Sequence, residues 1–545
     1  MKKKAMALLL VVVMAISSFA GCSNNSDSSQ GVNGTATENT APVKNKIDIP
    51  DEPQDGGILT IGLSASPKNL DPVKYTGTYE SQIIQNVADT LVAYKMDLTE
   101  IVPSIAKSWT VSDDGKDYSF TLRDDVYFHP GKFQDGRQVV GDDIKYSLER
   151  SHELSAMNRL DMIESVEVAD DFNVIVHLSE PNSAFLTALT NSGNSIVPKE
   201  EVEGWGDEFG NHLVGSGPFI MRDFKYDEEA VLVKNEKYWA QEPYLDGVTF
   251  KVITDINQMA NALRTGEIDF SEKLSGEAVK IIREDPNIEL METPGLHVSY
   301  VYFNQVKGPT ADKKVREALI KAVDTKELVK GVYQYGEAEV ASLPLPPGSW
   351  GYDKSLEEIV PAYDPEGAKE LLAEAGYPDG FSMTLHIANT ALREKMATIV
   401  QQYLKMNLNV DLDIQTSEWG TFSEIGSKGE ADMFGMSWTW YPDPYFFLNK
   451  MFASDAIGSL GNGQGFSNEE VDKLLSDALR VTEQDERAEI YKKALKVITE
   501  EYPGIFYGNE KVIWGVAPEV QGLVQRADDQ IFLVNEEVNV WKAAK

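Results

Sequence analysis

The stretch MFGMSWTWYPDPYFFL, residues Met433–Leu448, is the densest aromatic run in the chain. Before the prolines its large side chains alternate with small ones, which is the period of a strand with one bulky face. Pro442 and Pro444 fix the backbone angle φ and each removes an N–H donor, so the chain must turn there. The pattern predicts a strand that ends in a rigid corner.

The rings at this corner have two interpretations. Core packing would explain any one of them, because large apolar residues are mostly buried. Two tryptophans and a tyrosine beside a proline corner fit the wall of a binding site better, because such rings combine a large contact area with a polar atom that orients a ligand. We therefore expect Trp438 and Trp440 to face a ligand.

Composition excludes several classes of partner. A chain of 545 residues is too long for one hydrophobic core and predicts two or three domains. The apolar content of 42% is that of an ordinary globular protein. The formal charge of -37 argues against nucleic acid, since phosphate binding needs concentrated Lys and Arg. It also disfavours electrostatic adhesion to anionic lipid.

The N-terminus predicts export and a lipid anchor. Three lysines precede an apolar run, Ala5 to Ile16, and mainly small residues follow up to Gly21, so residues 1–21 are expected to be a signal peptide. Phe19-Ala20-Gly21-Cys22 resembles the bacterial lipobox, with Phe19 where leucine is usual, which implies acylation of Cys22. Cys22 is the single cysteine, so no intramolecular disulfide can form. The polar residues 22–53 are expected to be a flexible tether at the outer face of the membrane.

Catalytic constellations are missing from the sequence. The segment His152–Ala156 begins like a zinc-peptidase helix but has alanine where the second histidine must be. The six histidines are scattered singly, and the paired aspartates sit at turns and helix caps. We therefore expect no catalytic residue, no metal and no cofactor.

Several local patterns predict particular elements. Ile58–Leu63 alternates as a strand, and residues 83–92 carry apolar positions at helical spacing. Asp364 and Pro365 at the start, with Gly376 at the end, delimit a helix. Two capping boxes are predicted, Asp324 with Glu327 and Ser467 with Glu470.

A series of motifs from about residue 55 to the end resembles the family 5 extracellular solute-binding proteins, the oligopeptide- and dipeptide-binding class of ABC importers. The matching segments are Ala106–Trp109, Tyr118–Val126, Phe128–His129, Asp135–Val139, Gly141–Asp143, Gly215–Phe219, Asn235–Trp239, Arg264–Asp269, Phe303–Asn304, Val315–Leu319, Leu371–Tyr377, and Trp438 with Pro442–Pro444.

The resemblance implies an α/β, periplasmic-binding-protein-like fold with two lobes, three subdomains and a hinge. Lobe 1 would comprise residues 54–88, 196–293 and 509–545, with residues 89–195 as its inserted subdomain. Lobe 2 would comprise residues 294–508, and the hinge strands would cross near residues 292–300 and 507–511.

The resemblance also implies a ligand site. In members that bind peptides, the ligand backbone pairs like an added strand with one segment from each lobe. Carried over by position, the lobe 1 segment is Tyr75, Thr76, Gly77 and Thr78, and the lobe 2 segment is Met436, Ser437, Trp438 and Thr439. Trp419 corresponds to a tryptophan that lines side-chain pockets.

One departure from the family pattern bears on the solute. Peptide binders of this family place an aspartate for the ligand's ammonium group shortly after the residue equated with Trp438. Here Thr439, Trp440 and Tyr441 follow, and the segment is one residue short before Pro442. Unless Asp443 reaches back, a free peptide N-terminus loses a charge-assisted hydrogen bond.

The function implied is capture of a solute outside the cytoplasm by a monomeric lipoprotein, and its delivery to the permease subunits of an ABC importer. A peptide is the first expectation for the solute, and an oligosaccharide or another neutral or cationic solute is the alternative. A surface receptor or adhesin and a secreted enzyme are the remaining hypotheses. The sequence does not decide whether an ion or haem is bound.

Overall fold

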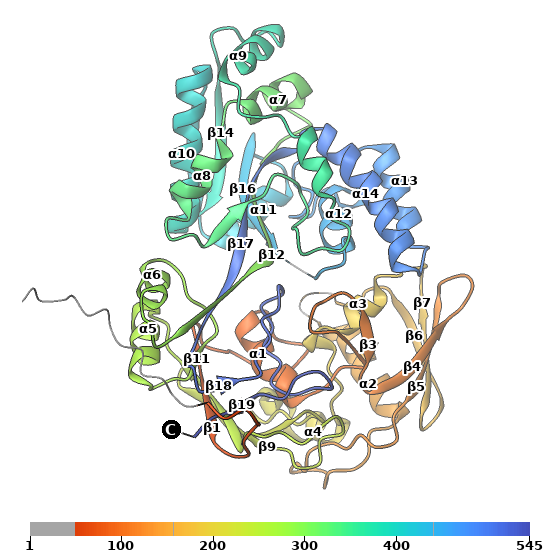
Figure 1. Ribbon diagram of the computed structural model, residues 1–545. Coiled ribbons are helices and arrows are strands. Elements are labelled where there is room, and N and C mark those ends of the chain that lie inside the picture. Colours follow the sequence, from red (N-terminus) through yellow and green to blue (C-terminus); the bar gives the residue numbers. More distant parts are fainter. Residues whose placement is uncertain (1–48, 156, 158, 440, 545) are drawn as a thin grey trace, which may run out of the picture. The chain divides into compact units, whose positions relative to one another are not determined.

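The computed structural model describes residues 49–155, 157, 159–439 and 441–544. These residues form a mixed α/β protein with two lobes, as Figure 1 shows. The predicted signal peptide, Cys22, nearly all of the predicted tether and Trp440 lie outside the described residues. Across the described part of the chain, every helix is too short or too polar to span a bilayer.

One sheet of eleven strands extends through both lobes in the order β15-β14-β16-β12-β17-β11-β1-β10-β9-β8, with β13 also paired to β17. Strand β1 is parallel to β10 and β11, and β14 is parallel to β15 and β16. The bounds are β1 Ile58–Leu63, β8 Phe219–Lys225, β9 Glu229–Lys234, β10 Gly247–Val252, β11 Phe270–Ser271, β12 Glu289–Phe303, β13 Ala338–Val340, β14 Ser382–Ala388, β15 Asp411–Ser417, β16 Met433–Thr439 and β17 Gly504–Val516.

The long antiparallel strands β12 and β17 connect the two lobes (Figure 1). Their register shifts between Pro294 and His297, and again between Ser299 and Tyr300. Gly295 lies in the first irregularity, where a Cβ would stand 2.6 Å from the backbone oxygen of Glu510. Such irregularities bend a strand pair, and they fall in the segment where the hinge strands are predicted to cross; the hinge itself stays a prediction.

A separate antiparallel sheet in the order β4-β5-β7-β6 forms within the predicted inserted subdomain. Strands β5 and β7 bury every second side chain, as expected for a sheet with one covered face. Two short ladders, β2-β3 and β18-β19, complete the described strands. The bounds are β2 Val92–Tyr94, β3 Ile101–Pro103, β4 Ala106–Val111, β5 Asp117–Leu122, β6 Ile163–Asp170, β7 Asn173–Leu178, β18 Val520–Gln521 and β19 Trp541–Lys542.

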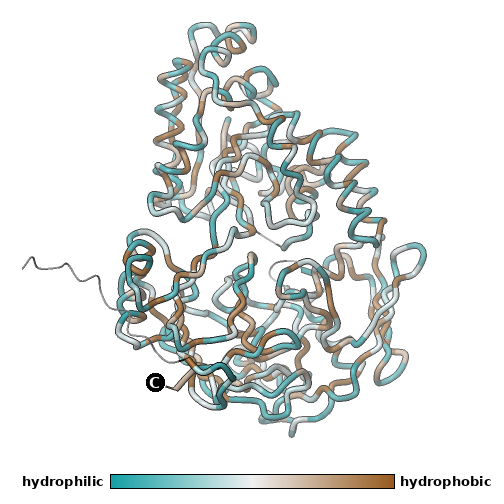
Figure 2. Tube along the Cα trace, viewed as in Figure 1, coloured by the Kyte–Doolittle hydropathy of each residue, from teal (hydrophilic) through white to brown (hydrophobic). Residues whose placement is uncertain are grey.

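Helices cover these sheets, and Figure 2 shows hydrophobic residues concentrated along the strands and on one side of the helices. The α-helices are α1 Thr78–Val87, α2 Gly141–Leu154, α3 Phe185–Leu189, α4 Lys199–Trp205, α5 Ile256–Thr265, α6 Glu277–Arg283, α7 Lys313–Lys321, α8 Thr325–Val332, α9 Pro365–Glu374, α10 Ala391–Leu408, α11 Trp419–Ser427, α12 Tyr445–Phe452, α13 Glu469–Ala478 and α14 Gln484–Glu500. The 3-10 helices are η1 Ser192–Asn194, η2 Gly206–Asn211, η3 Pro309–Ala311, η4 Lys354–Ile359 and η5 Ser454–Ala456.

Strand β16 separates two hydrophobic cores of lobe 2. Met433 belongs to the core that α10 covers, whereas Phe434 and Met436 belong to the core that α12 and α14 cover. Successive side chains of a strand point to opposite faces, so the aromatic face predicted from the sequence faces the second of these cores. The large residues of this strand up to Met436 are therefore core residues.

Most of the predicted local elements are present. The strand Ile58–Leu63 is confirmed, and Asp364 caps α9, whose first residue is Pro365. Asp324 caps α8 as predicted, while the side chain of Glu327, expected to complete the capping box, accepts a hydrogen bond from Lys330 instead. The predicted cap at Ser467 is wrong, because the side chain of the next residue, Asn468, accepts hydrogen bonds from the backbone N–H groups of α13.

The helix predicted over residues 83–92 is shorter than expected. Helix α1 ends at Val87, Ala88 is extended, and Val92 begins β2. The side chain of the intervening Asp89 is buried and accepts hydrogen bonds from Ser216, Tyr238 and Trp239. These tertiary contacts override the helical spacing of Leu91 and Val92. The exact boundaries of the predicted domains stay a prediction.

Candidate functional site

Two predicted ligand-contacting regions, Trp419 and residues 436–439, lie at the carboxyl ends of strands β15 and β16 of the lobe 2 sheet. Strands β14, β15 and β16 run parallel, so their carboxyl ends meet at one edge, where open α/β sheets bind ligands. Trp419 is separated from the end of β15 by one residue, begins α11 and is 50% exposed. The guanidinium of Arg393, in the first turn of α10, lies 5.6 Å from the centroid of its ring.

The predicted lobe 2 ligand segment has one open backbone edge. Strand β14 pairs with β16 only over Met433–Gly435, whereas β12 pairs with β16 as far as Thr439. In the described part of the chain, no strand pairs with the outer edge of residues 436–439. An unpaired strand edge is a template for another strand, so this backbone is able to accept an extended peptide.

The side chains of this segment are mainly structural. Met436 is 3% exposed and packs in the lobe 2 core. Trp438 is partly buried against the same core, and its Nε1 donates a hydrogen bond to the backbone oxygen of Phe446 over 3.1 Å. Ser437 is partly exposed, and Thr439 pairs through its backbone with His297. The binding wall expected from Trp438 and Trp440 stays a prediction, since Trp440 lies outside the described residues.

The lobe 1 segment Tyr75–Thr78 leads into α1 and has a fixed shape. Gly77 is the N-cap residue in an extended conformation, and its N–H donates to Glu80 Oε2 over 2.8 Å. The other oxygen of Glu80 accepts the N–H of Lys68 over 2.9 Å. Burial raises the pKa of Glu80, although these backbone hydrogen bonds act in the opposite direction. A Cβ on Gly77 would lie 2.6 Å from Glu80 Oε2, so a larger residue there would have to displace the side chain of Glu80.

A cavity of about 280 Å³, called the cleft cavity below, contains all four residues of this segment. Tyr441, from the proline corner of lobe 2, is also part of its lining. Burial raises the pKa of Tyr441, while the charge of Arg159 and a hydrogen bond with Asn191 lower it. The lining residues are Tyr75, Thr76, Gly77, Thr78, Ser81, Gln85, Thr90, Ala93, Tyr94, Met157, Arg159, Thr190, Asn191, Ser192, Tyr441, Arg526, Asp528, Gln530 and Phe532.

Arg159, Asn191, Tyr441 and Arg526 were not among the predicted site residues. Asn191 Oδ1 accepts a hydrogen bond from the hydroxyl of Tyr75 over 2.8 Å, so the predicted segment is tied to this set. These residues are distant in the sequence and carry no shared motif. Tyr441 belongs to the aromatic run at the proline corner, where the sequence predicts a binding wall, whereas the positions of Arg159, Asn191 and Arg526 follow only from the tertiary structure.

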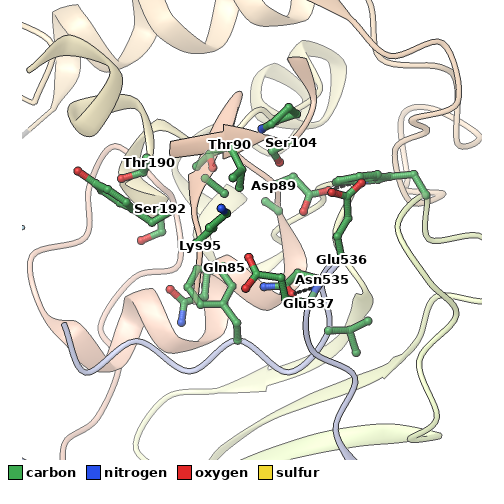
Figure 3. A pocket seen from close by; sticks show the side chains of 18 of the residues that line it. Gln85, Asp89, Thr90, Lys95, Ser104, Thr190, Ser192, Asn535, Glu536 and Glu537 are labelled. Carbon is green, nitrogen blue, oxygen red and sulfur yellow. Dashed lines mark hydrogen bonds between the residues drawn. The ribbon is translucent and has the colours of Figure 1, made fainter. Parts of the chain in front are cut away.

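A second chamber of about 370 Å³ adjoins the cleft cavity and shares seven lining residues with it, among them Gln85, Tyr94 and Phe532. Figure 3 shows Thr190 and Ser192 on one side of this chamber and Asn535, Glu536 and Glu537 on another. Asp89 lines it too, and burial raises the pKa of its carboxyl group, while hydrogen bonds from Trp239, Ser216 and Tyr238 lower it. The remaining lining includes the rings of Tyr238, Trp239 and Phe532.

The carboxylate of Asp443, a candidate partner for a ligand ammonium group, is bound by other protein residues. It is 1% exposed and forms an ion pair with Arg487. Thr187 Oγ1, from the predicted inserted subdomain, also donates to Asp443 Oδ2 over 3.2 Å. Asp443 therefore has a structural role within the described protein, and it does not replace the missing amine-binding aspartate.

The histidines of the described residues do not converge. Among residues 49–155, 157, 159–439 and 441–544, no group of three or more His, Asp or Glu side chains has an arrangement that could hold a metal ion. His129 and His152 each hydrogen-bond to a backbone oxygen, of Gly217 and Leu160 respectively.

Several known proteins resemble this chain along most of its length. The family model described as "Bacterial extracellular solute-binding proteins, family 5 Middle" matches residues 100–459. Heme-binding protein A of Haemophilus influenzae is 33% identical over 478 residues, which cover 82% of this chain and 86% of that protein. The dipeptide-binding protein of Escherichia coli is 30% identical over 489 residues, which cover 84% of this chain and 90% of that protein.

A solved structure shares the fold as well. The ABC transporter-associated periplasmic binding protein DppA from Helicobacter pylori, in complex with the peptide STSA, aligns with a TM-score of 0.74 and 30% identity. The alignment covers 90% of this chain and 98% of that chain. The two-lobed binding-protein fold predicted from the sequence is thereby confirmed.

Proposed function

Because the chain belongs to the bacterial extracellular solute-binding proteins of family 5, as its motifs predicted, we propose that it captures a peptide between its two lobes. The bound peptide is then delivered to the permease subunits of an ABC importer. The observation that carries this proposal is the cleft cavity, where the predicted segment Tyr75–Thr78 of lobe 1 meets Tyr441 from the lobe 2 corner.

The backbone geometry favours an extended peptide over other solutes. The outer edge of residues 436–439 offers N–H and C=O groups to an added strand, and a peptide has the matching groups at the matching spacing. In this proposal Ser437, Trp438 and Thr439 contribute backbone hydrogen bonds, and Trp419 and Trp440 contribute ring faces to side chains of the solute.

The protein acts as a binding protein and not as an enzyme in this proposal. It works as a monomer, and acylated Cys22 holds it at the outer face of the cell membrane through the tether of residues 22–53. The proposed boundaries are those predicted from the sequence, with lobe 1 discontinuous and lobe 2 spanning residues 294–508.

A haem or an oligosaccharide is the second candidate solute. Asp443 is buried and paired with Arg487, so its carboxylate is not available to a peptide ammonium group, which removes one feature specific to peptides. The aromatic residues favour an oligosaccharide as this candidate, and the similarity to a protein named heme-binding protein A adds haem.

A thermal-shift screen separates these solutes, because a ligand that binds only the folded state raises the melting temperature. The protein is screened with di- to pentapeptides, the same peptides with acetylated N-termini, oligosaccharides and haem. We expect free and acetylated peptides to stabilise the protein to a similar degree. If only haem or only an oligosaccharide stabilises the protein, that compound is the solute and the peptide assignment is wrong. If none of the compounds stabilises it, the proposal is contradicted.

A further inference from the structure

The charges that line the cleft cavity do not cancel. Arg526 is neutralised by Asp528, whose two oxygens accept hydrogen bonds from its Nε over 3.0 Å and from its Nη2 over 2.6 Å. Arg159 has no carboxylate within ion-pair distance among the described residues. The cavity therefore presents one uncompensated positive charge, carried by Arg159, to whatever occupies it.

The side chain of Arg159 is held in place by neutral groups. Its Nη2 donates to the backbone oxygen of Tyr75 over 2.9 Å, and its Nη1 donates to Ser155 Oγ over 3.1 Å. Its guanidinium carbon lies 4.3 Å from the centroid of the Tyr75 ring. On another side it packs against Gly193, where a Cβ would stand 2.7 Å from Nε.

These contacts use only part of the hydrogen-bonding capacity of the guanidinium. An arginine has five N–H donors, and two acceptors for them are found within the described part of the chain. A planar guanidinium that is already oriented, with donors left over, is suited to binding a carboxylate through two parallel hydrogen bonds. Its neighbours in the lining, Asn191 and Ser192, are uncharged and do not compete with an incoming anion.

We propose that Arg159 binds the terminal carboxylate of the peptide solute, so that lobe 1 anchors the C-terminal end of the peptide in the cleft cavity. This inference rests on the proposed function. In the described part of the lobe 2 corner, Asp443 is paired with Arg487 and is not free to bind an ammonium group. The carboxylate end therefore supplies the charged anchor of the complex.

The test compares peptides that differ only in this charge. One pool of synthetic di- to pentapeptides is prepared as free acids and again as C-terminal amides, and both are titrated into the purified full-length protein. The free acids are expected to bind roughly tenfold to hundredfold more tightly than the amides, which is the value of a hydrogen bond to a charged group. The variant Arg159→Gln should lower the affinity for the acids far more than the affinity for the amides, so that the difference between the two pools disappears.

A matched control is Arg222→Gln, which removes an exposed arginine of β8 outside the cavity lining and should leave both affinities unchanged. Arg159→Lys keeps the positive charge but loses the planar guanidinium that can donate two parallel hydrogen bonds, and it should bind the acids with intermediate affinity. Equal binding of acids and amides by the unaltered protein would overturn the inference and leave the proposed function intact. Binding of neither pool would overturn both. If Arg159→Gln fails to fold, the comparison of acids and amides on the unaltered protein decides.

Discussion

The carboxylate of Asp443 and the guanidinium of Arg487 form a buried ion pair with two contacts, 3.1 Å between Nη2 and Oδ1 and 3.0 Å between Nη1 and Oδ2. The backbone N–H of Tyr445 donates to Oδ1 over 3.0 Å, and Thr187 Oγ1 donates to Oδ2. Both oxygens are thus occupied by protein donors. The pair joins the proline corner to α14 and, through Thr187, to the predicted inserted subdomain.

Replacing Asp443 with asparagine should destabilise the protein strongly. Loss of one partner leaves a buried, uncompensated arginine, so the free energy of unfolding is expected to fall by about 3–5 kcal/mol. Urea denaturation measures this change. The exposed Asp455→Asn is the matched control and should change the free energy by less than about 0.5 kcal/mol. A stable Asp443→Asn variant that loses affinity only for peptides with a free amine would contradict the structural role.

Methylation of peptide backbone nitrogens should weaken binding in an alternating pattern. A peptide that pairs with the outer edge of residues 436–439 directs every second N–H toward β16. Methyl groups at those nitrogens are expected to lower the affinity by about tenfold, because each removes a hydrogen bond and adds a clash. Methyl groups at the intervening nitrogens serve as the control. Calorimetric titration provides the affinities, and equal losses at all positions would argue against strand addition.

Acid should destabilise the protein partly through His129. Burial lowers the pKa of this histidine to about 4 from its usual 6.5. Between these two pH values His129 is protonated in the unfolded chain and neutral in the folded protein. The neutral His129 therefore stabilises the folded protein fully above pH 6.5. This part of the unfolding free energy, about 3 kcal/mol in total, is lost as the pH falls toward 4.

The variant His129→Gln isolates this effect, because glutamine does not titrate. Urea denaturation of both proteins at pH 7, about 5.5 and about 4.5 gives the difference in unfolding free energy between them. That difference should shift in favour of the variant as the pH falls. A difference that stays constant with pH would show that His129 titrates normally.

Replacing Cys22 with serine should release the protein from the membrane. Serine cannot carry the thioether-linked lipid, and the polar residues 22–53 have little affinity for a bilayer. Fractionation of cells, followed by immunoblotting, should find the unaltered protein with membranes and the variant in the soluble fraction. A variant that stays in the membrane fraction would contradict the proposal that Cys22 anchors the protein.

Local signals in the sequence predicted the elements that depend on neighbouring residues. The strand Ile58–Leu63 and the start of α9 follow from alternation and from the Asp364-Pro365 cap, and both are confirmed. The choice between Ser467 and Asn468 as the cap of α13 could not be made, since both residue types favour that position. The side chain of Ser467 bonds to Ser454 Oγ instead, 13 residues away.

Residues whose roles depend on distant partners could not be predicted. The sequence shows Asp443 after the aromatic run but does not show that Arg487 lies against it. The segment Tyr75–Thr78 came from the family resemblance and lies in the cleft cavity, whereas Arg159 belongs to no motif. Arg159 packs against Gly193, a contact between distant residues that no local pattern in the sequence indicates.

The central claim, that a peptide is captured between the lobes, is tested most directly by the distance between them. In a Cys22→Ser background the chain has no other cysteine, so Lys237→Cys on lobe 1 and Lys369→Cys on lobe 2 place two fluorophores at exposed positions. Free-acid peptides should raise the energy transfer between the fluorophores in a saturable manner as the lobes close about β12 and β17. Peptide binding, verified calorimetrically, with no change in energy transfer would contradict the account.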